Sequence, residues 1–414
     1  MDTPSSASAK KPDVKKPKAL FLSPESPYPV IGGGPLRSAS LVEFLSRHFS
    51  VHAIVFHQDG DSDPAQAFPE GLVDRLDVLK LAPHSKGPIA RATRNSIRIF
   101  RNRPPLFDRF SGFSGAIEKL VAGQQYDAAV LEHFWCAPYV DQVRPHAQRV
   151  ILDLHNIESA WHRSLADQES GARALALRRF ATVSGALERQ WLPKFDHLLV
   201  TSAEDAALAL AFAPRANVAV YPNALPLIPP PARFERDQIV FSGNLEYAPN
   251  ILAVRFFRDR IWPDLRLRWP ALEWNILGKH PEAIQSIVRG DSRIRLTGFV
   301  ENAVAALATA KVAVVPVLSG SGTRVKILEA WAAGTAVVST TLGAAGLGSV
   351  QGEHLLLADH PGAFAGAVSQ LLASAELRAQ IGAAGRNFYV ERYTWPAAWR
   401  SLNCVFGNDV GETM

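Results

Sequence analysis

One segment between residues 312 and 340 constrains the fold of this chain more than any other. It starts with the apolar run Val312 to Val317, which is typical of a buried parallel strand. A glycine- and serine-rich loop follows at residues 320–323, and then a stretch with helical spacing of apolar residues that ends at Gly334. Residues 336–340 begin a second strand. The order strand, glycine loop, helix, strand predicts a βαβ unit in a parallel sheet.

The polar residues of this segment suit a nucleotide. A glycine loop before a helix leaves backbone N–H groups free, and a helix N-terminus favours a phosphate. Arg324 and Lys326 would add positive charge there. Glu329 lies in the otherwise apolar helical stretch, and its carboxylate can accept two hydrogen bonds from ribose hydroxyls. A carboxylate satisfied within the core is the alternative interpretation of Glu329.

The run from Lys326 to Val338, KILEAxAxGxxVV, resembles the nucleotide-sugar signature of retaining glycosyltransferases of family 4. The resemblance is strongest over residues 238–395. It implies the α/β fold named GT-B, in which two Rossmann-like, doubly wound parallel-sheet domains face each other across a cleft. Many members have a glutamate eight residues before the equivalent of Glu329. This chain has Ser321 there, within a Gly-x-Gly-Thr-Arg-x-Lys sequence that some branches of the family share.

The chain length predicts two domains, because 414 residues are too many for one ordinary core. We expect a basic, disordered tail over residues 1–18 and a proline-rich linker over residues 225–236. The resemblance implies an acceptor domain over 19–224 and a nucleotide-sugar domain over 237–390. It also implies a C-terminal helix over 391–414 that returns to the first domain.

The composition is that of a globular protein, with 47% hydrophobic and 20% charged residues. Two cysteines argue against a disulfide framework and against a zinc cluster. We find no apolar run long enough to span a bilayer and no signal peptide, so we expect a cytoplasmic location. The net charge is +5, of which the tail supplies +3 through five lysines and two aspartates. No nucleic-acid partner is therefore expected.

A second glycine loop opens the N-terminal domain. Residues 19–22 predict a strand, and residues 36–49 predict a helix after the loop. The loop lacks the G-x-G-x-x-G fingerprint, so NAD is not expected. In the family the equivalent loop faces the donor diphosphate and the acceptor, which assigns Gly33 and Gly34 to the donor site; an ordinary βα turn is the alternative. Arg37 either meets a phosphate or is a solvated residue of the first helical turn.

His155 is the first candidate for catalysis. It lies at the C-terminal end of the expected strand over residues 149–156, and open α/β sheets bind ligands beyond the carboxyl ends of their strands. Its Asp-x-His-Asn-x-Glu context resembles the family segment whose histidine reaches the donor sugar or the phosphate. A structural histidine is the alternative. Glu132 and His133, after the preceding strand, carry a weaker form of the same inference.

The resemblance implies further donor contacts in the second domain. The loop after the strand at 238–242 lacks the Arg and Lys that many members use to hold the diphosphate, which leaves Arg324 and Lys326 to neutralise it. The catalytic set is thus His155, Lys326 and Arg324. The expected donor-binding set, besides Gly33 and Gly34, is Gly243, Asn244, Phe299, Val300, Ser321, Gly322, Thr323 and Glu329.

Residues 86–109 contain seven basic residues and one acidic residue. Arg91, Arg94, Arg98 and Arg101 are spaced to share one face of a helix. Such a face can lie on an anionic membrane or bind an acidic acceptor. A solvated helix face is the alternative.

These features predict a hexosyltransferase-type glycosyltransferase that moves a sugar from a UDP- or GDP-sugar to an acceptor hydroxyl with retention. Its role would be in glycan, exopolysaccharide or glycolipid synthesis, with a glycan or lipid-linked acceptor and peripheral contact with the inner face of the membrane. No metal and no cofactor are expected. Two alternatives stay open: a binding module that has lost catalysis, motivated by Ser321, and an inverting GT-B enzyme for a small molecule, with His155 as base. The missing dinucleotide fingerprint disfavours a dehydrogenase.

Overall fold

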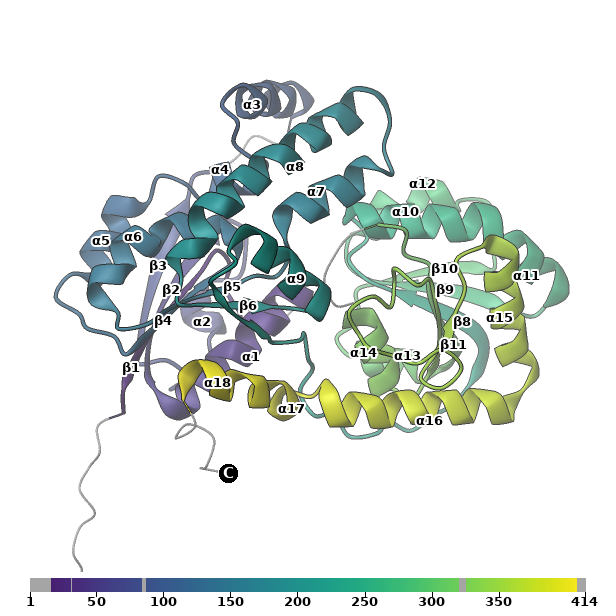
Figure 1. Ribbon diagram of the computed structural model, residues 1–414. Helices are drawn as coiled ribbons and strands as arrows, with labels where there is room; N and C mark the ends of the chain where they lie inside the picture. The colour runs from purple at the N-terminus through teal and green to yellow at the C-terminus, as the bar shows by residue number, and fades with distance from the viewer. Residues whose placement is uncertain (1–15, 31, 84–86, 320–324, 408–414) are drawn as a thin grey trace, which may run out of the picture.

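The computed structural model describes residues 16–30, 32–83, 87–319 and 325–407. They form two α/β domains, each built on a parallel sheet with helices packed against it (Figure 1). The predicted fold class, two Rossmann-like doubly wound domains, is confirmed. The central strands are mostly apolar and are buried over nearly their whole length, because both faces of each sheet are covered.

The first sheet has seven strands in the order β3-β2-β1-β4-β5-β6-β7. Their bounds are Lys18–Ser23 (β1), Ser50–Gln58 (β2), Arg75–Leu81 (β3), Ala128–Glu132 (β4), Val150–Asp153 (β5), His197–Val200 (β6) and Asn217–Val220 (β7). The second sheet has six strands in the order β10-β9-β8-β11-β12-β13. Their bounds are Arg236–Ser242 (β8), Glu273–Leu277 (β9), Ile294–Gly298 (β10), Ala310–Val315 (β11), Ala336–Ser339 (β12) and Leu356–Leu357 (β13).

Helices alternate with these strands along the chain. Those of the first domain are Gly33–His48 (α1), Pro64–Ala67 (α2), Pro88–Phe100 (α3), Pro105–Arg109 (α4), Ser114–Val121 (α5), Val140–Val143 (α6), Glu158–Ala166 (α7), Gly171–Trp191 (α8) and Ala203–Phe212 (α9). After β8 come Ala248–Phe256 (α10), Trp262–Arg268 (α11), Gln285–Val288 (α12), Ala303–Leu307 (α13), Val325–Ala332 (α14), Pro361–Ala373 (α15), Ala375–Arg392 (α16), Trp395–Trp399 (α17) and Asn403–Phe406 (α18). The shorter turns are Phe134–Tyr139 (η1), Arg144–His146 (η2), Leu192–Lys194 (η3), Phe257–Ile261 (η4), Pro281–Ala283 (η5) and Arg400–Leu402 (η6).

The strand order reverses once in each sheet, between β1 and β4 in the first and between β8 and β11 in the second. Loops that leave such neighbouring strands go to opposite faces of the sheet, which opens a crevice at the carboxyl ends. In the first domain that crevice lies between the glycine loop before α1 and the residues after β4. In the second it lies between the loop after β8 and helix α14. The topology therefore places both crevices where a ligand between the domains can reach them.

The end of the chain returns to the first domain, as Figure 1 shows for α17 and α18. In place of one helix over 391–414, α16 ends at Arg392 and short helices follow. Trp399 of α17 is buried, and its Nε1 donates to the backbone oxygen of Ser40 at 3.1 Å. The Arg47 guanidinium lies 4.4 Å from the centre of the Trp399 ring. These contacts hold α17 against helix α1.

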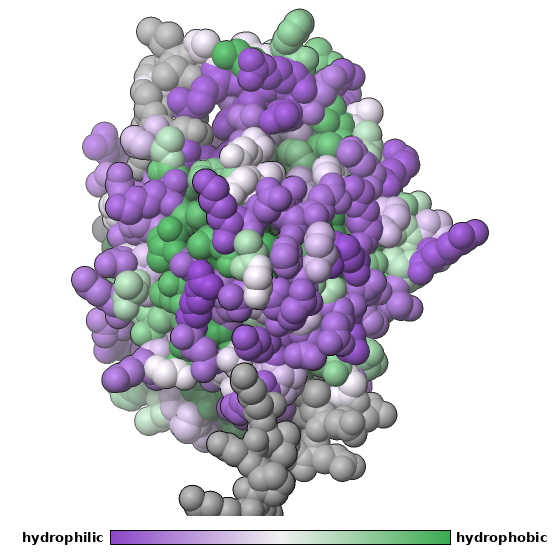
Figure 2. Space-filling model, turned by 90° about the vertical axis from the view of Figure 1, so that its left-hand side faces the viewer, coloured by the Kyte–Doolittle hydropathy of each residue, from purple (hydrophilic) through white to green (hydrophobic). Residues whose placement is uncertain are grey.

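The outer face of the first domain is mostly hydrophilic, with apolar side chains visible between the polar ones (Figure 2). Among the described residues, no helix combines the length and the apolar character that a membrane span requires.

We predict that Trp399→Ala lowers the free energy of unfolding by about 3–5 kcal/mol, because it removes a buried indole and its hydrogen bond to Ser40. Denaturant unfolding followed by fluorescence and circular dichroism measures the change. Phe234→Ala serves as the control, since Phe234 is 69% exposed and should change stability by less than about 0.5 kcal/mol. Equal effects of the two substitutions would contradict the docking role of Trp399.

Candidate active site

A pocket of about 330 Å³ lies between the two domains. The first domain contributes Gly32, Gly33 and Leu36 to its wall, from the loop before α1 and from α1 itself. A Cβ atom placed on Gly33 would lie 3.5 Å from Cγ2 of Val325, the first residue of α14. The N-terminal glycine loop thus lies so close to the start of α14 that even one added methyl group would touch Val325. The second domain lines the pocket with Gly243, Asn244, Tyr247, Pro249, Asn250, Val317, Val325, Lys326 and Glu329.

Glu329 and Lys326 are the acidic and the basic residue of this wall in the part of the chain that the structure describes. Glu329 Oε2 accepts a hydrogen bond from Ser242 Oγ at 3.4 Å. Burial raises the pKa of Glu329 to about 7, although Lys326 and Ser242 act to lower it. Lys326 Nζ donates to Asn250 Oδ1 at 2.6 Å and lies 4.4 Å from the centre of the Phe241 ring. The site thus pairs a poorly solvated carboxyl group with a cation held one helical turn earlier.

Two glycines let the loops after β8 and β9 pack together. A Cβ atom on Gly278, whose φ is 145°, would lie 1.7 Å from the backbone oxygen of Gly243. Asn250 Nδ2 donates to the backbone oxygen of Asn244 at 2.7 Å. Asn250 therefore holds both the Asn244 loop and Lys326. Sequence reasoning missed this positioning residue, because an asparagine in a first helical turn carries no distinctive signal.

In the first domain a buried ion pair lies at the carboxyl end of the sheet. Arg37 is 1% exposed, and its Nε and Nη2 donate to the two carboxylate oxygens of Asp153 at 2.8 and 2.5 Å. Its Nη1 donates to the backbone oxygen of Tyr221 and to Asn223 Oδ1. The expectation that Arg37 meets a phosphate or lies in solvent was wrong. The guanidinium instead joins α1 and β5 to the segment that leaves β7.

His155 lies beside the same ion pair. Its Nε2 is 3.4 Å from Asp153 Oδ2 and 3.7 Å from Glu132 Oε2. Burial opposes protonation of the imidazole, but the two carboxylates prevail and raise the pKa of His155 to about 9. Arg37 and His155 thus balance Asp153 and Glu132, and His155 is a cation at neutral pH.

His133 packs against His155. The centres of the two rings are 3.5 Å apart, and the other face of His133 stacks on Trp135 with 4.3 Å between ring centres. Its φ of 59° is unusual for a residue with a side chain. Burial and the charge of His155 lower the pKa of His133, although Glu25 acts in the opposite direction. The neutral imidazole of His133 therefore packs against the cationic imidazole of His155.

Among the described residues, Glu132, His133 and His155 form the one group with several potential metal-ligating atoms, all within 4.8 Å of one another. Lone pairs of an imidazole lie in its ring plane, and these two planes are only 31° apart at 3.5 Å separation. Their nitrogen atoms do not converge on one ion, so the arrangement does not fit a tetrahedral metal site. The expectation that the sequence lacks a D-x-D motif, from which no metal was expected, was wrong: D-x-D occurs at Asp59 and Asp61 and again at Asp61 and Asp63, all of them exposed after β2.

The pocket between the domains thus brings together five of the residues expected in the donor and catalytic sets: Gly33, Gly243, Asn244, Lys326 and Glu329. Gly34, His155, Phe299 and Val300 do not line it. Ser321, Gly322, Thr323 and Arg324 lie outside the described residues.

The expected arginine stripe is not a single exposed face. Arg98 is buried, and its Nε donates to Asp108 Oδ2 at 2.9 Å, which ties α3 to α4. Arg94 is half-buried and Arg101, just after the helix, is exposed. The side chain of Arg91 lies outside what the structure describes. Arg91, Arg94 and Arg98 belong to α3, whereas Arg101 follows its last residue, and the buried Arg98 shows that part of the expected face is turned towards the protein.

Residues 236–374 match the model of the family described as glycosyl transferases group 1. The chain carries a glycosyl transferases group 1 domain. A curated relative, an uncharacterized 44.6 kDa protein in the cps region of Klebsiella pneumoniae, is 20% identical over 366 residues, which is 84% of this chain and 89% of the relative.

Solved structures resemble the chain over almost its whole length. Sucrose-phosphate synthase from Thermosynechococcus elongatus superimposes with a TM-score of 0.71 at 19% identity, covering 94% of this chain and 98% of the other. Anabaena HepE, in a complex with UDP and glucose, gives a TM-score of 0.65 at 12% identity, covering 94% and 99%. These likenesses show that the fold is GT-B.

We predict that Arg37→Met lowers the free energy of unfolding by about 3–5 kcal/mol, because it leaves the buried Asp153 without its partner. Denaturant unfolding measures the loss. Arg258→Gln is the control: its exposed pair with Asp259 should contribute less than about 1 kcal/mol. An Arg37→Met protein as stable as Arg258→Gln would contradict the structural role of the buried pair.

Proposed function

We propose that the chain is a glycosyltransferase that transfers a hexose from a UDP- or GDP-sugar to an acceptor hydroxyl with retention. The observation that carries this proposal is the pocket between the domains, where Glu329 and Lys326 face the N-terminal glycine loop. The glycosyl transferases group 1 domain supports it. So do the structural relatives that were solved with UDP, among them a variant of TarM from S. aureus.

Each polar group of the pocket has a role in binding the donor. The Glu329 carboxylate accepts hydrogen bonds from the two ribose hydroxyls. Lys326, held by Asn250, neutralises the diphosphate, with Arg324 as a second cation. Gly33 and Gly243 keep the backbone close to the ligand from both sides. No metal is required in this proposal, because the cations of the protein balance the diphosphate.

The reaction breaks the bond between the anomeric carbon and the diphosphate oxygen. Negative charge develops on the leaving oxygen, and a fixed cation such as Lys326 stabilises it. The sugar gains oxocarbenium character, and the acceptor oxygen forms the new bond to the anomeric carbon. Its proton leaves with the diphosphate.

The protonation state of His155 favours a retaining mechanism over the inverting alternative. A general base must be able to accept a proton, and Asp153 and Glu132 hold His155 in the protonated form at neutral pH. The cationic imidazole is instead a hydrogen-bond donor to an oxygen of the donor sugar or phosphate.

The biological setting is inferred from the relative in the Klebsiella cps region, which supports a role in polysaccharide synthesis. We infer a cytoplasmic enzyme that acts on a glycan or lipid-linked acceptor, with peripheral contact with the inner face of the membrane. The second candidate is a module that binds a nucleotide sugar without transfer, favoured by Ser321 at the position where many family members have glutamate.

We predict that UDP or GDP binds about tenfold more weakly at pH 6 than at pH 8, because ribose hydroxyls donate to the ionised form of Glu329. The pKa of this group is raised to about 7, so the ionised form is lost as the pH falls through 7. Calorimetric titration across this range measures the affinity. Glu329→Gln should bind weakly with no such pH dependence; a wild-type affinity that does not change with pH would contradict the role of Glu329.

We predict that Lys326→Ala and His155→Ala each reduce transfer by about 100-fold to 1,000-fold, since the first removes the cation of the pocket wall and the second removes the hydrogen-bond donor that we propose for the donor sugar or phosphate. Release of the nucleoside diphosphate from UDP- and GDP-sugars measures the rate. Lys311→Gln is the matched control: Lys311 is near the amino end of β11 and pairs with Asp237. Wild-type protein that binds the nucleotide but releases no sugar would favour the binding module.

A further inference from the structure

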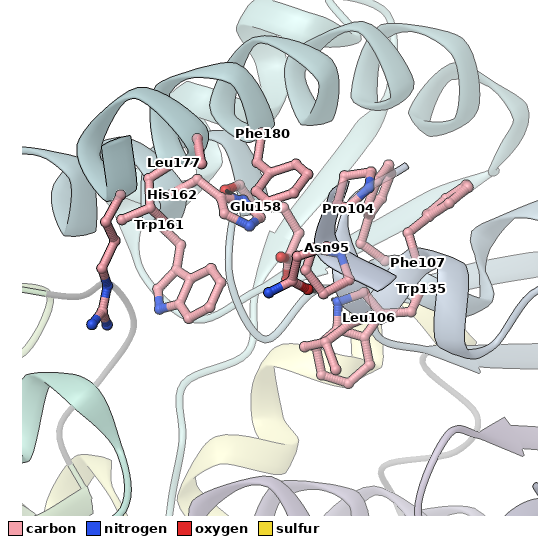
Figure 3. Close-up of a pocket in the computed structure, with 14 residues that line it drawn as sticks. Asn95, Pro104, Leu106, Phe107, Trp135, Glu158, Trp161, His162, Leu177 and Phe180 are labelled. Carbon is pink, nitrogen blue, oxygen red and sulfur yellow. Dashed lines mark hydrogen bonds between the residues drawn. The ribbon is translucent and has the colours of Figure 1, made fainter. Parts of the chain in front are cut away.

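A second cavity, of about 260 Å³, lies within the first domain between α4, η1, α7 and α8 (Figure 3). Most of its wall is aromatic or aliphatic. The main apolar contributors are Leu106, Phe107, Phe134, Trp135, Trp161 and Phe180. Small-molecule sites usually measure roughly 300–1,000 Å³, so this cavity suits one chain or one ring and not an oligosaccharide.

The buried polar groups in the wall are neutral. Glu158 Oε1 accepts from Trp135 Nε1 at 3.2 Å, and burial together with Glu188 raises the pKa of Glu158 to about 8. His162 Nδ1 lies 2.8 Å from the Glu158 backbone oxygen, and burial lowers the pKa of His162 to about 4. A sugar in this cavity would lose hydrogen bonds to water and gain few in return. A hydrocarbon group carries no such penalty.

The cavity adjoins the pocket between the domains. Trp161 lines the cavity, and its Nε1 donates to the hydroxyl of Tyr247, a wall residue of the other pocket, at 3.1 Å. Glu158, at the cavity wall, follows His155 by three residues. The wall of the cavity is therefore hydrogen-bonded to the wall of the pocket between the domains.

The charges around the cavity favour an anionic head group. Arg173 lies in the cavity wall, with a side chain that is 66% exposed and is paired with Glu169 at 3.2 Å. Arg101 and Arg103 line a neighbouring cavity of about 470 Å³, which shares the walls formed by Phe107 and Trp135. Basic groups outnumber acidic ones here, and such surfaces attract phosphates.

We propose that this cavity holds the hydrocarbon chain of a lipid-phosphate acceptor, with the phosphate at the arginine side and the acceptor hydroxyl directed to the cleft. This proposal rests on the proposed function, because the cleft supplies the donor. It assigns α7 and α8 to the recognition of the acceptor.

The test uses decyl phosphate, below its critical micelle concentration, in calorimetric titrations of the full chain. Ala176 lies in the cavity wall, and Ala176→Trp fills the space. We expect it to weaken decyl phosphate binding by at least about tenfold, since several methylene groups lose their buried position. Leu175→Trp is the matched control, because Leu175 immediately precedes Ala176 on α8 and is 71% exposed. Unchanged binding by Ala176→Trp would overturn the assignment of the cavity.

Head-group variants complete the test. Arg173→Gln, a change at an exposed side chain, should weaken decyl phosphate several-fold and leave decyl maltoside unaffected. Inorganic phosphate alone should not bind measurably. Wild-type protein that binds decyl maltoside as tightly as decyl phosphate would overturn the assignment to lipid phosphates. UDP and GDP binding, measured on the same samples, separates the two proposals: the absence of binding by both nucleotides refutes the donor site, whereas decyl phosphate binding reports only on the cavity.

Discussion

The buried ion pair of Arg37 and Asp153 holds together the elements of the first domain that form its part of the candidate site. Taking two charges out of water costs several kcal/mol for each ion, so the pair persists only with complete hydrogen bonding. Arg37 meets this requirement by donating to both oxygens of Asp153 and to Tyr221 and Asn223. The helix after the glycine loop, the strand before His155 and the segment leaving β7 are therefore held as one unit.

This pair also determines which domain supplies positive charge to a ligand. Arg37 is paired with Asp153, and His155 is balanced by Glu132, so these four residues together carry no net charge at neutral pH. A diphosphate in the cleft must then be neutralised mainly from the second domain, where Lys326 is held by a neutral asparagine. The two domains thus contribute different chemistry, a hydrogen-bonding surface from one and a cation from the other.

The sequence predicted the fold because buried parallel strands leave continuous apolar runs and glycine loops mark the turns that follow them. The spacing after one such strand also led to Glu329 and Lys326. Contacts between distant residues could not be predicted in this way: the partner of Arg37 lies 116 residues away. Helical spacing grouped Arg98 with its neighbours but gave no sign that α4 would bury it. No sequence pattern indicated the aromatic cavity, because the residues that line it come from several elements without a common period.

The hydrogen bond between Trp161 and Tyr247 couples the aromatic cavity to the cleft. Trp161 belongs to α7 of the first domain, and Tyr247 precedes α10 of the second. A movement of the domains that closes the cleft on a ligand must either carry α7 along or break this bond, at a cost of about 0.5–1.5 kcal/mol. If α7 moves along, the cavity changes shape when the cleft closes. If the hydrogen bond breaks, the indole of Trp161 at the cavity wall loses its partner. The hydrogen bond from Trp161 to Tyr247 is therefore a direct contact between the wall of the aromatic cavity and the wall of the cleft.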